Sequence, residues 1–284
     1  IALITAALLC FSSCSASRMW NGLRVGLERF LYNVGEPSHE FVKDYKAPGY
    51  FAQPRYTKGY YRSLLNQEDQ DLYDLLLETL QEMKGRLYDI NVRVERFEEV
   101  LSFIYNDHPE LFWVNFSETY QYIMSEDIIY LCNFKDLYRY EPDQRNRLQE
   151  QLNDAASDLL AGIPEGATPY EKELYIHDRI MEKTVYVDGA PNAHNLLGVL
   201  LDGKAVCEGY AKAFQYLCLK AGLDCLLITG TADNQDHGWN MVRLENSWYL
   251  VDITWDDTAS VTGEQPGGYL SYAYFNVTTQ DLAR

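Results

Sequence analysis

Basic residues are scarce in this chain: 24 lysines and arginines stand against 42 aspartates and glutamates, which gives a formal net charge of −18. Proteins that bind nucleic acids neutralise phosphates with clustered Lys and Arg. The sequence shows no basic stripe, so we set nucleic acid aside as a partner. An acidic surface keeps a protein soluble and favours cationic partners, but it does not identify one.

The sequence also lacks the spacings that are typical of metal sites. Neither Cys-x-x-Cys nor His-Glu-x-x-His occurs, so we expect no zinc site and no cofactor. Six cysteines scattered through 284 residues do not make a disulfide framework. A bridge between Cys218 and Cys225 stays open as an alternative.

An apolar run stands at the very start of the chain. Residues 1–11 are too few to cross a bilayer as a helix, and they match the hydrophobic region of a signal peptide. Two serines then precede Cys14, as in a bacterial lipobox, although Phe11 stands where that motif usually has Leu. We expect lipidation of Cys14 and an extracytoplasmic, membrane-anchored protein. Plain secretion and a retained anchor or buried segment are the alternatives. No initiator Met or basic segment precedes the run, so we expect the sequence to begin inside its signal peptide.

Hydrophobic periodicity and turn residues predict separate helical and strand segments, which together indicate an α+β protein. The expected helices are 19–32, a helix that Asn66 caps and Gly85 ends, 94–104, 148–159, 169–183 and 207–221. The expected strands are 111–114, a hairpin of 119–124 and 128–134, 223–229, and a second hairpin of 239–244 and 248–252.

Three residues that can perform acyl transfer follow one another in the last third of the chain. Cys207 stands where a loop turns into a helix, and His237 and Asp252 follow on strand-like segments. The unpaired N–H groups of a first helical turn favour a thiolate. An imidazole can take the thiol proton, and a carboxylate can orient the imidazole. Cys207 is therefore the candidate nucleophile, His237 the candidate base and Asp252 the candidate orienting acid.

Counting along the strands does not by itself bring His237 to Asp252. A hairpin turn over residues 245–247 places Asp252 opposite Asn240, whose side chain points to the other face of the sheet from that of His237. We read residues 230–238 as a polar loop, in which Gly238 can kink the backbone or hold a bulge and so bring the histidine round.

Several neighbours of these residues have simpler interpretations. His177 falls at the spacing of its apolar helix neighbours, so we expect a packing histidine. Asp256 and Asp257 are expected to be turn and cap residues rather than metal ligands. Glu208 would oppose a thiolate if it pointed inward, so we expect it to point away from Cys207.

Three motifs surround the candidate residues. They are Gly203-x-x-x-Cys207-x-Gly209-Tyr210-Ala211, His237-x-Trp239-Asn240 and Trp248-Tyr249-x-Val251-Asp252-x-Thr254-Trp255-Asp256-Asp257. In this order and spacing they resemble the core motifs of the transglutaminase-like superfamily over about residues 170–277, most closely those of its bacterial, secreted, papain-like branch. The resemblance implies a papain-like core, in which the Cys-bearing helix packs on an antiparallel sheet. It also assigns the same roles to Cys207, His237 and Asp252. No calcium-binding loop is visible, so the calcium dependence of animal transglutaminases is not expected.

We divide the chain into three parts on this basis. Residues 1–17 are a signal peptide with a lipobox-like end, residues 18–165 an N-terminal helical and β-hairpin region, and residues 166–284 a transglutaminase-like catalytic core. The resemblance implies an exported cysteine hydrolase or acyltransferase that acts on amide bonds through a Cys thioester. Hydrolysis is favoured over cross-linking.

The expected partners are a peptide or protein substrate, with cell-wall peptide as one candidate, and the membrane through the lipid on Cys14. The alternative is a non-catalytic cell-surface module that holds a peptide or glycan in an aromatic groove. A structural protein with a decayed enzyme core is a third interpretation.

Overall fold

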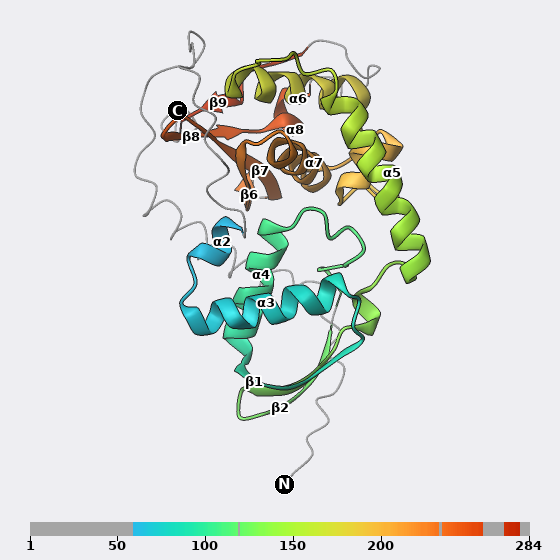
Figure 1. The fold of residues 1–284 in the computed structure, drawn as a ribbon, viewed down its shortest axis with the longest axis vertical. Helices are drawn as coiled ribbons and strands as arrows, with labels where there is room; N and C mark the ends of the chain where they lie inside the picture. Colours follow the sequence, from blue (N-terminus) through green and yellow to red (C-terminus); the bar gives the residue numbers. More distant parts are fainter. Residues whose placement is uncertain (1–58, 119, 233–234, 258–269, 279–284) are drawn as a thin grey trace. The chain divides into compact units, whose positions relative to one another are not determined.

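The computed structural model describes residues 59–118, 120–232, 235–257 and 270–278 (Figure 1). The expected signal peptide, the lipidation site Cys14 and the helix at 19–32 lie outside the described residues. The described chain forms two compact units, which divide between Arg147 and Leu148 inside helix α5 (Pro142–Leu160). Among the described residues, no helix has both the length and the apolar character that a bilayer crossing requires.

The first unit combines helices with a three-stranded antiparallel sheet in the order β1-β3-β2. Its helices are α2 (Tyr60–Ser63), α3 (Gln67–Gln81), α4 (Val94–Asp107) and the short 3-10 turn η2 (Lys135–Leu137). Its strands are β1 (Arg86–Arg93), β2 (Gln121–Ser125) and β3 (Ile128–Asn133). The expected hairpin is thus confirmed, and its two strands pair across a turn at Glu126 and Asp127.

The two helices α3 and α4 begin where the sequence predicts. The Asn66 side chain accepts a hydrogen bond from Asp69 N at 3.0 Å and caps α3. The helix ends at Gln81 rather than running to Gly85, because Met83 adopts a left-handed conformation with φ of 54°. In α4, Phe97 and Ile104 of the apolar stripe are fully buried, and Leu101 is 7% exposed.

Two expectations for the first unit fail. Residues 111–114 are buried as expected, but they form turns with a single isolated bridge, Val114 to Tyr138, and not a strand. Strand β1 was not expected, because Asp89 and Asn91 are poor strand residues. Both have positive φ, and they lie where the pairing with β3 shifts its register.

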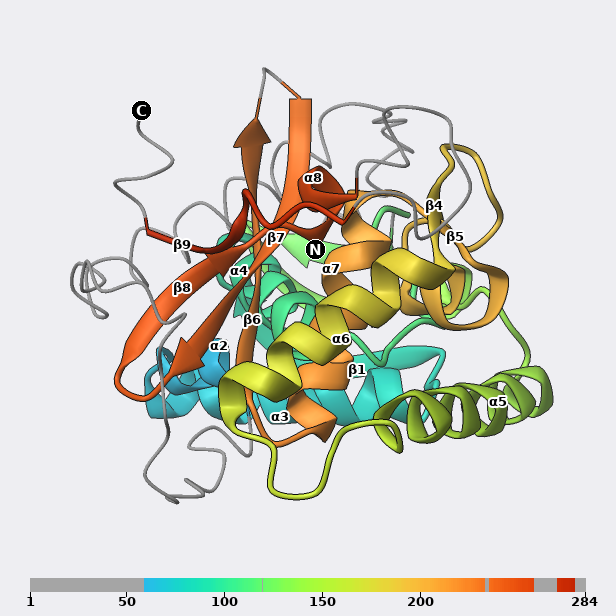
Figure 2. The ribbon, with the colours of Figure 1, turned by 90° about the horizontal axis from the view of Figure 1, so that it is seen from above.

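The second unit is layered, with α7 on a four-stranded antiparallel sheet and α6 packed on α7 (Figure 2). The strands lie in the order β6 (Asp224–Ala232), β7 (Gln235–Leu244), β8 (Ser247–Val251) and β9 (Phe275–Val277). The helices are α6 (Pro169–Lys183), α7 (Cys207–Lys220), the single turn α8 (Ile253–Asp256) and a short π-helix, η3 (Gly198–Asp202). A two-stranded parallel pair, β4 (Val185–Tyr186) with β5 (Lys204–Ala205), completes the unit. The expected α+β class, with the Cys-bearing helix on an antiparallel sheet, is confirmed.

The helices of this unit begin and end close to the capping residues that the sequence predicts. Thr168 and Glu171 form the expected capping box at the start of α6. Gly222, with φ of 82°, follows the end of α7. In α5 the residues of the expected stripe, Leu152, Ala156 and Leu159, are buried.

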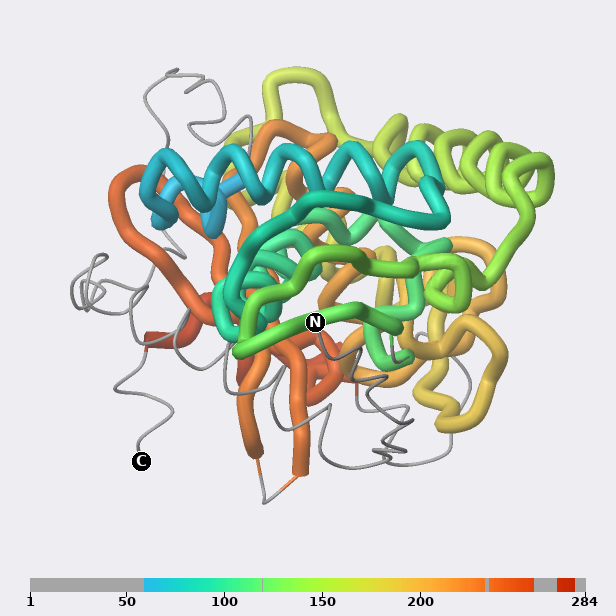
Figure 3. The backbone as a smooth tube through the Cα atoms, turned by 90° about the horizontal axis from the view of Figure 1, so that it is seen from below, coloured from blue at the N-terminus to red at the C-terminus, as the bar shows by residue number. Residues whose placement is uncertain are grey.

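The segment read as a polar loop is in fact strand. β6 and β7 pair in regular register from Asp224 and Arg243 to Ala232 and Gln235, and they run side by side to their common tip (Figure 3). The prediction of a loop over 230–238 is therefore wrong, since only 233–234 fall outside the described strands. His237 lies within β7, opposite Gly230.

The described cysteines all carry free thiols. Cys218 and Cys225 are both buried as free thiols, with no covalent bond between them. The alternative of a bridge between them is therefore wrong. Cys132, Cys218 and Cys225 are buried, whereas Cys207 is partly exposed.

Candidate active site

Cys207 is the first residue of α7, and the chain before it is tightly held. Val206 N donates to Ala193 O at 3.1 Å, and β5 is paired with β4 just upstream. Gly209 packs directly against Ala193 O, where a Cβ would collide with the carbonyl. Gly209 thus lets the backbone of the turn at residues 193–195 approach the first turn of α7 closely. The thiol thus sits at a fixed helix N-terminus and stays partly open to solvent.

The hairpin register brings Asp252 to the side of His237. Leu244 pairs with Ser247, so the turn contains only Glu245 and Asn246 and is one residue shorter than expected. Val251 then lies opposite Asn240, which puts the next residue, Asp252, level with Trp239 rather than with Asn240. Positions 239 and 237 share a face because side chains alternate along a strand. Asp252 and His237 therefore lie on the same face of the sheet, although the sequence predicted opposite faces, and no kink at Gly238 is needed.

The structure brings the three predicted side chains together. His237 Nε2 lies 2.5 Å from Asp252 Oδ2, and both residues are buried, with 8% of each exposed. The Cys207 thiol lies close enough to the same imidazole to raise its pKa. Because Nε2 is engaged by the carboxylate, Nδ1 is the ring nitrogen that is left for the thiol. The other Asp252 oxygen, Oδ1, accepts a hydrogen bond from Trp255 N at 3.1 Å and caps α8. The Asp252 carboxylate therefore both binds His237 and caps the following helical turn.

The environment of His237 favours its protonated form. Burial lowers the pKa of His237, but hydrogen bonds to Asp252 and then to Cys207 raise it, and the pKa reaches about 9. An imidazole with this pKa is an imidazolium at neutral pH and can donate its proton to a leaving group. Protonated His237 therefore contributes to the free energy of unfolding. This contribution is fully present below pH 6.5, which is about the pKa of histidine in the unfolded chain. This contribution is lost as the pH rises through about 9.

Aromatic rings enclose the imidazole. Trp255 stacks on His237 with ring centroids 5.0 Å apart and planes 18° apart, and Trp239 stacks at 5.8 Å and 26°. Trp255 is 37% exposed, and Tyr186 on β4 is 41% exposed. Burial, then the charge of Cys207, raises the pKa of Tyr186. Trp255 and Tyr186 are thus partly exposed aromatic residues of this region.

A family model for the transglutaminase-like superfamily matches residues 158–253, from the end of α5 to the start of α8. This part of the chain belongs to the transglutaminase-like superfamily. Human kyphoscoliosis peptidase is 36% identical over 69 residues, which cover 20% of this chain and 10% of the relative, and the mouse protein gives the same figures. The chain therefore spans about a tenth of the length of the curated relatives it matches.

Solved structures resemble the chain more weakly. A TGase has a TM-score of 0.35 and 15% identity, and the match covers 48% of this chain and 43% of that one. The periplasmic domain of TgpA from Pseudomonas aeruginosa has a TM-score of 0.30 and 16% identity, with 52% and 63% covered. Both TM-scores are low, and neither structure adds to the family assignment.

Other motif residues of the transglutaminase-like domain hold its three segments together. Tyr210 OH donates to Asp257 Oδ2 at 2.6 Å, which ties α7 to the residue after α8. Asn240 Nδ2 donates to Ala211 O at 3.0 Å and to Leu226 O at 3.1 Å, which ties α7 to the sheet. Buried amides and hydroxyls need such partners. Asp257 is thus a structural anchor, in keeping with the expectation of a turn or cap residue.

Glu208, the residue after the candidate nucleophile, is engaged on the outer side of α7. Its carboxylate lies 2.7 Å from Lys212 Nζ and 3.0 Å from His194 Nδ1. The expectation that Glu208 points away from the thiol agrees with these contacts. The described part of the transglutaminase-like domain holds no cluster of three or more His, Cys, Asp or Glu side chains that could bind a metal ion.

The position of Trp239 depends on a glycine in the neighbouring strand. A Cβ at Gly230 would lie 2.7 Å from the Trp239 ring, closer than a carbon contact allows. We expect Gly230→Ala to push Trp239 from its place beside His237 and to lower the free energy of unfolding by about 1–3 kcal/mol. Urea unfolding measures this loss.

A matched control separates the clash from the effect of glycine itself. A Cβ at Gly85 would meet nothing within 4 Å, so Gly85→Ala should change the unfolding free energy by less than about 0.5 kcal/mol. Equal unfolding free energies for Gly230→Ala and Gly85→Ala would show that the indole does not depend on the missing Cβ.

Proposed function

We propose that the protein is a cysteine hydrolase or acyltransferase that acts on amide bonds of peptides or proteins. The observation that carries the proposal is the 2.5 Å bond between His237 Nε2 and Asp252 Oδ2, with the Cys207 thiol on the same imidazole at a helix N-terminus. Nucleophile, base and orienting acid are the parts that covalent amide chemistry requires.

The reaction runs in two stages on these residues. The Cys207 thiolate attacks the amide carbonyl, and the backbone N–H of Cys207 donates to the developing oxyanion. The C–N bond breaks as the His237 imidazolium gives its proton to the leaving amine, which leaves an acyl thioester on Cys207. His237, now neutral, removes a proton from water or from a second amine as it attacks the thioester. The C–S bond then breaks, the acid or the new amide leaves, and Cys207 is again a thiolate beside the protonated His237.

Water is the acceptor that we favour over an amine. The support is the resemblance of the motifs to the peptidase-like branch, and the human relative is named a peptidase. Incubation of the protein with peptide and glutamine-containing libraries, followed by mass spectrometry, tests the choice. Cleaved bonds support hydrolysis, loss of ammonia indicates deamidation, and joined peptides indicate transfer. Binding without any mass change would favour the non-catalytic module.

We further propose that the protein acts outside the cytoplasm, anchored through a lipid on Cys14, with cell-wall peptide as a candidate substrate. The apolar run 1–11 and the small residues before Cys14 support this location. Expression in a bacterium fed labelled palmitate should give a labelled protein in the membrane fraction. Cys14→Ser should abolish the label, whereas Cys132→Ser should keep it. A label that persists in Cys14→Ser would contradict the anchor.

A further inference from the structure

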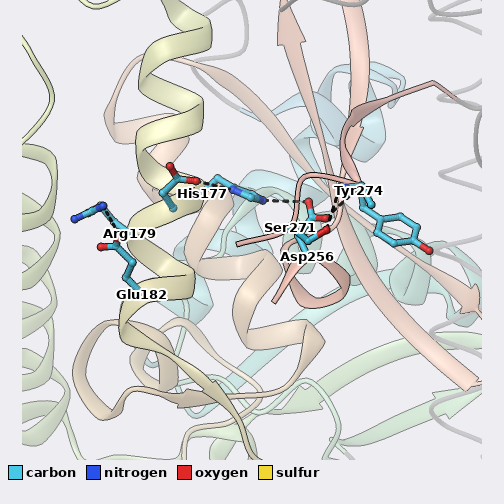
Figure 4. Close-up of polar contacts among 8 residues, drawn as sticks. His177, Arg179, Glu182, Asp256, Ser271 and Tyr274 are labelled. Atoms are coloured by element: carbon cyan, nitrogen blue, oxygen red, sulfur yellow. Dashed lines mark hydrogen bonds and ion pairs between the residues drawn. The ribbon is translucent and has the colours of Figure 1, made fainter. Parts of the chain in front are cut away.

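A second histidine–carboxylate pair joins α6 to the end of α8. His177 Nε2 lies 3.2 Å from Asp256 Oδ2, and neither side chain is exposed to solvent. The other ring nitrogen, Nδ1, lies 3.2 Å from Asp178 Oδ1. Figure 4 shows the imidazole on α6 pointing toward Asp256. The ring also packs on Phe275, with centroids 4.7 Å apart. His177 is therefore a packing histidine, as expected, but with a polar contact on each ring nitrogen.

Asp256 is linked to Asp252 through the backbone on both sides. Asp256 Oδ1 accepts from Tyr274 N at 2.9 Å, and Tyr274 O accepts from Asp252 N at 3.0 Å. Asp256 N donates to Asp252 O at 3.1 Å. A closed path of short contacts thus runs from the His177 ring to the peptide groups of Asp252.

The turn that carries Asp252 needs such support from outside. α8 has only four residues, and a single helical turn is not stable by itself. The Asp252 carboxylate is bound to Trp255 N through one oxygen and to His237 through the other. A shift of α8 therefore moves the carboxylate, and a charge-assisted bond of 2.5 Å weakens steeply when its partners separate.

We propose that His177 and Asp256 are positioning residues, whose buried pair fixes α8 so that the Asp252 carboxylate stays within bonding reach of His237. The proposal deepens the proposed function and rests on it for its meaning. Neither residue touches the Cys207 thiol or the His237 ring through any contact that the structure describes. Their effect passes through the backbone of α8.

Two carboxylates contact the His177 imidazole, Asp178 at Nδ1 and Asp256 at Nε2. Burial lowers the pKa of His177, but hydrogen bonds to Asp178 and Asp256 prevail and raise it. Glu173, one turn earlier on α6, accepts a hydrogen bond from Asn276 Nδ2 at 3.0 Å, and burial raises its pKa to about 8. It is therefore neutral at pH 7, and Asp178 and Asp256 are the carboxylates that contact the imidazole. Tyr272 covers the ring at 5.6 Å.

The pKa of His237 tests the proposal without any substrate. In protein with isotope-labelled histidine, NMR titration should give a pKa of about 9 for His237 in the unmodified chain. The signal is assigned by its loss in His237→Gln. In Asp256→Asn and His177→Gln we expect this pKa to fall toward the ordinary 6.5, because Asp252 no longer stays within bonding reach. Once a substrate is known, kcat should fall about 10–100-fold with little change in KM.

Two further variants complete the test. Glu182→Gln breaks the outward pair with Arg179 on the same helix, also drawn in Figure 4, and should leave the pKa of His237 at about 9. Asp178→Asn removes the partly exposed carboxylate at Nδ1 of His177. We expect the pKa of His237 to fall in this variant too, but by less than in Asp256→Asn. A pKa of His237 that stays at about 9 in folded Asp256→Asn, His177→Gln and Asp178→Asn overturns the proposal. Because the readout is a titration, it stands even if Cys207 proves not to be a nucleophile.

Discussion

Replacing Cys207 with alanine will lower amide turnover by about 10⁴-fold or more, because no other described side chain at the site can form the thioester. Cys207 is partly exposed and lies at the first position of α7, where alanine keeps the helix. We therefore expect the circular dichroism spectrum and the urea midpoint to stay close to those of the unmodified protein. Turnover of a peptide identified from the libraries measures the loss.

The matched control is Cys218→Ala in the same helix. Cys218 is fully buried, so its removal should cost stability, on the order of 1 kcal/mol, but leave turnover within a few-fold. Turnover that survives in Cys207→Ala would contradict the proposed nucleophile. Equal losses in the two variants would point to a general effect of the helix.

Asp252→Asn should lower kcat by about 10²–10⁴-fold and also move its pH dependence. Asparagine preserves the cap on Trp255 N, since it is as good an N-cap as aspartate. It cannot stabilise the imidazolium, so the pKa of His237 should fall from about 9 toward 6.5. In the unmodified protein, turnover needs the imidazolium and declines as the pH rises through about 9. In Asp252→Asn the decline should begin well below that pH.

Asp257→Asn is the control for this change. Asp257 is also a buried carboxylate next to α8, but its partner is Tyr210 OH rather than His237. We expect Asp257→Asn to lower the free energy of unfolding, but turnover should still decline as the pH rises through about 9. The same alkaline limb in Asp252→Asn and in the unmodified protein would mean that the carboxylate does not set the charge of His237.

The candidate site could be predicted from the sequence as a set of residues, but not as a geometry. Cys207, His237 and Asp252 follow from residue chemistry and motif order, whereas their approach depends on a turn of two residues at 245–246 instead of three. One residue of register moves every side chain of a strand to the other face. The turn residue Glu245, with φ of 55°, carries no Gly or Asn signal for this conformation.

Helices were easier to predict than strands for a physical reason. A helix signals itself through local periodicity and caps, as at Asn66 and Thr168, while a strand depends on partners that lie far along the chain. Strand β1 contains Asp89 and Asn91, and the buried residues 111–114 have strand-like side chains without a neighbouring strand. Tertiary pairing decided both cases.

The contact between His177 and Asp256 could not be predicted from the sequence for a similar reason. His177 and Asp256 are 79 residues apart and share no motif spacing. The one signal was the polarity of His177 on an otherwise apolar helix face, where a buried imidazole needs partners. Asp256, the first carboxylate of the Trp-Asp-Asp run, is that partner.

Site-resolved alkylation at neutral pH shows whether His237 activates the Cys207 thiol. The protein is treated with iodoacetamide for increasing times, and each cysteine is followed by peptide mass spectrometry, with buried Cys132, Cys218 and Cys225 as internal references. We predict rapid modification of Cys207 in the unmodified chain and a rate at least about tenfold lower in folded His237→Ala, because the imidazolium stabilises the thiolate. A Cys207 that reacts no faster than the buried cysteines, or at the same rate in both proteins, would contradict the account.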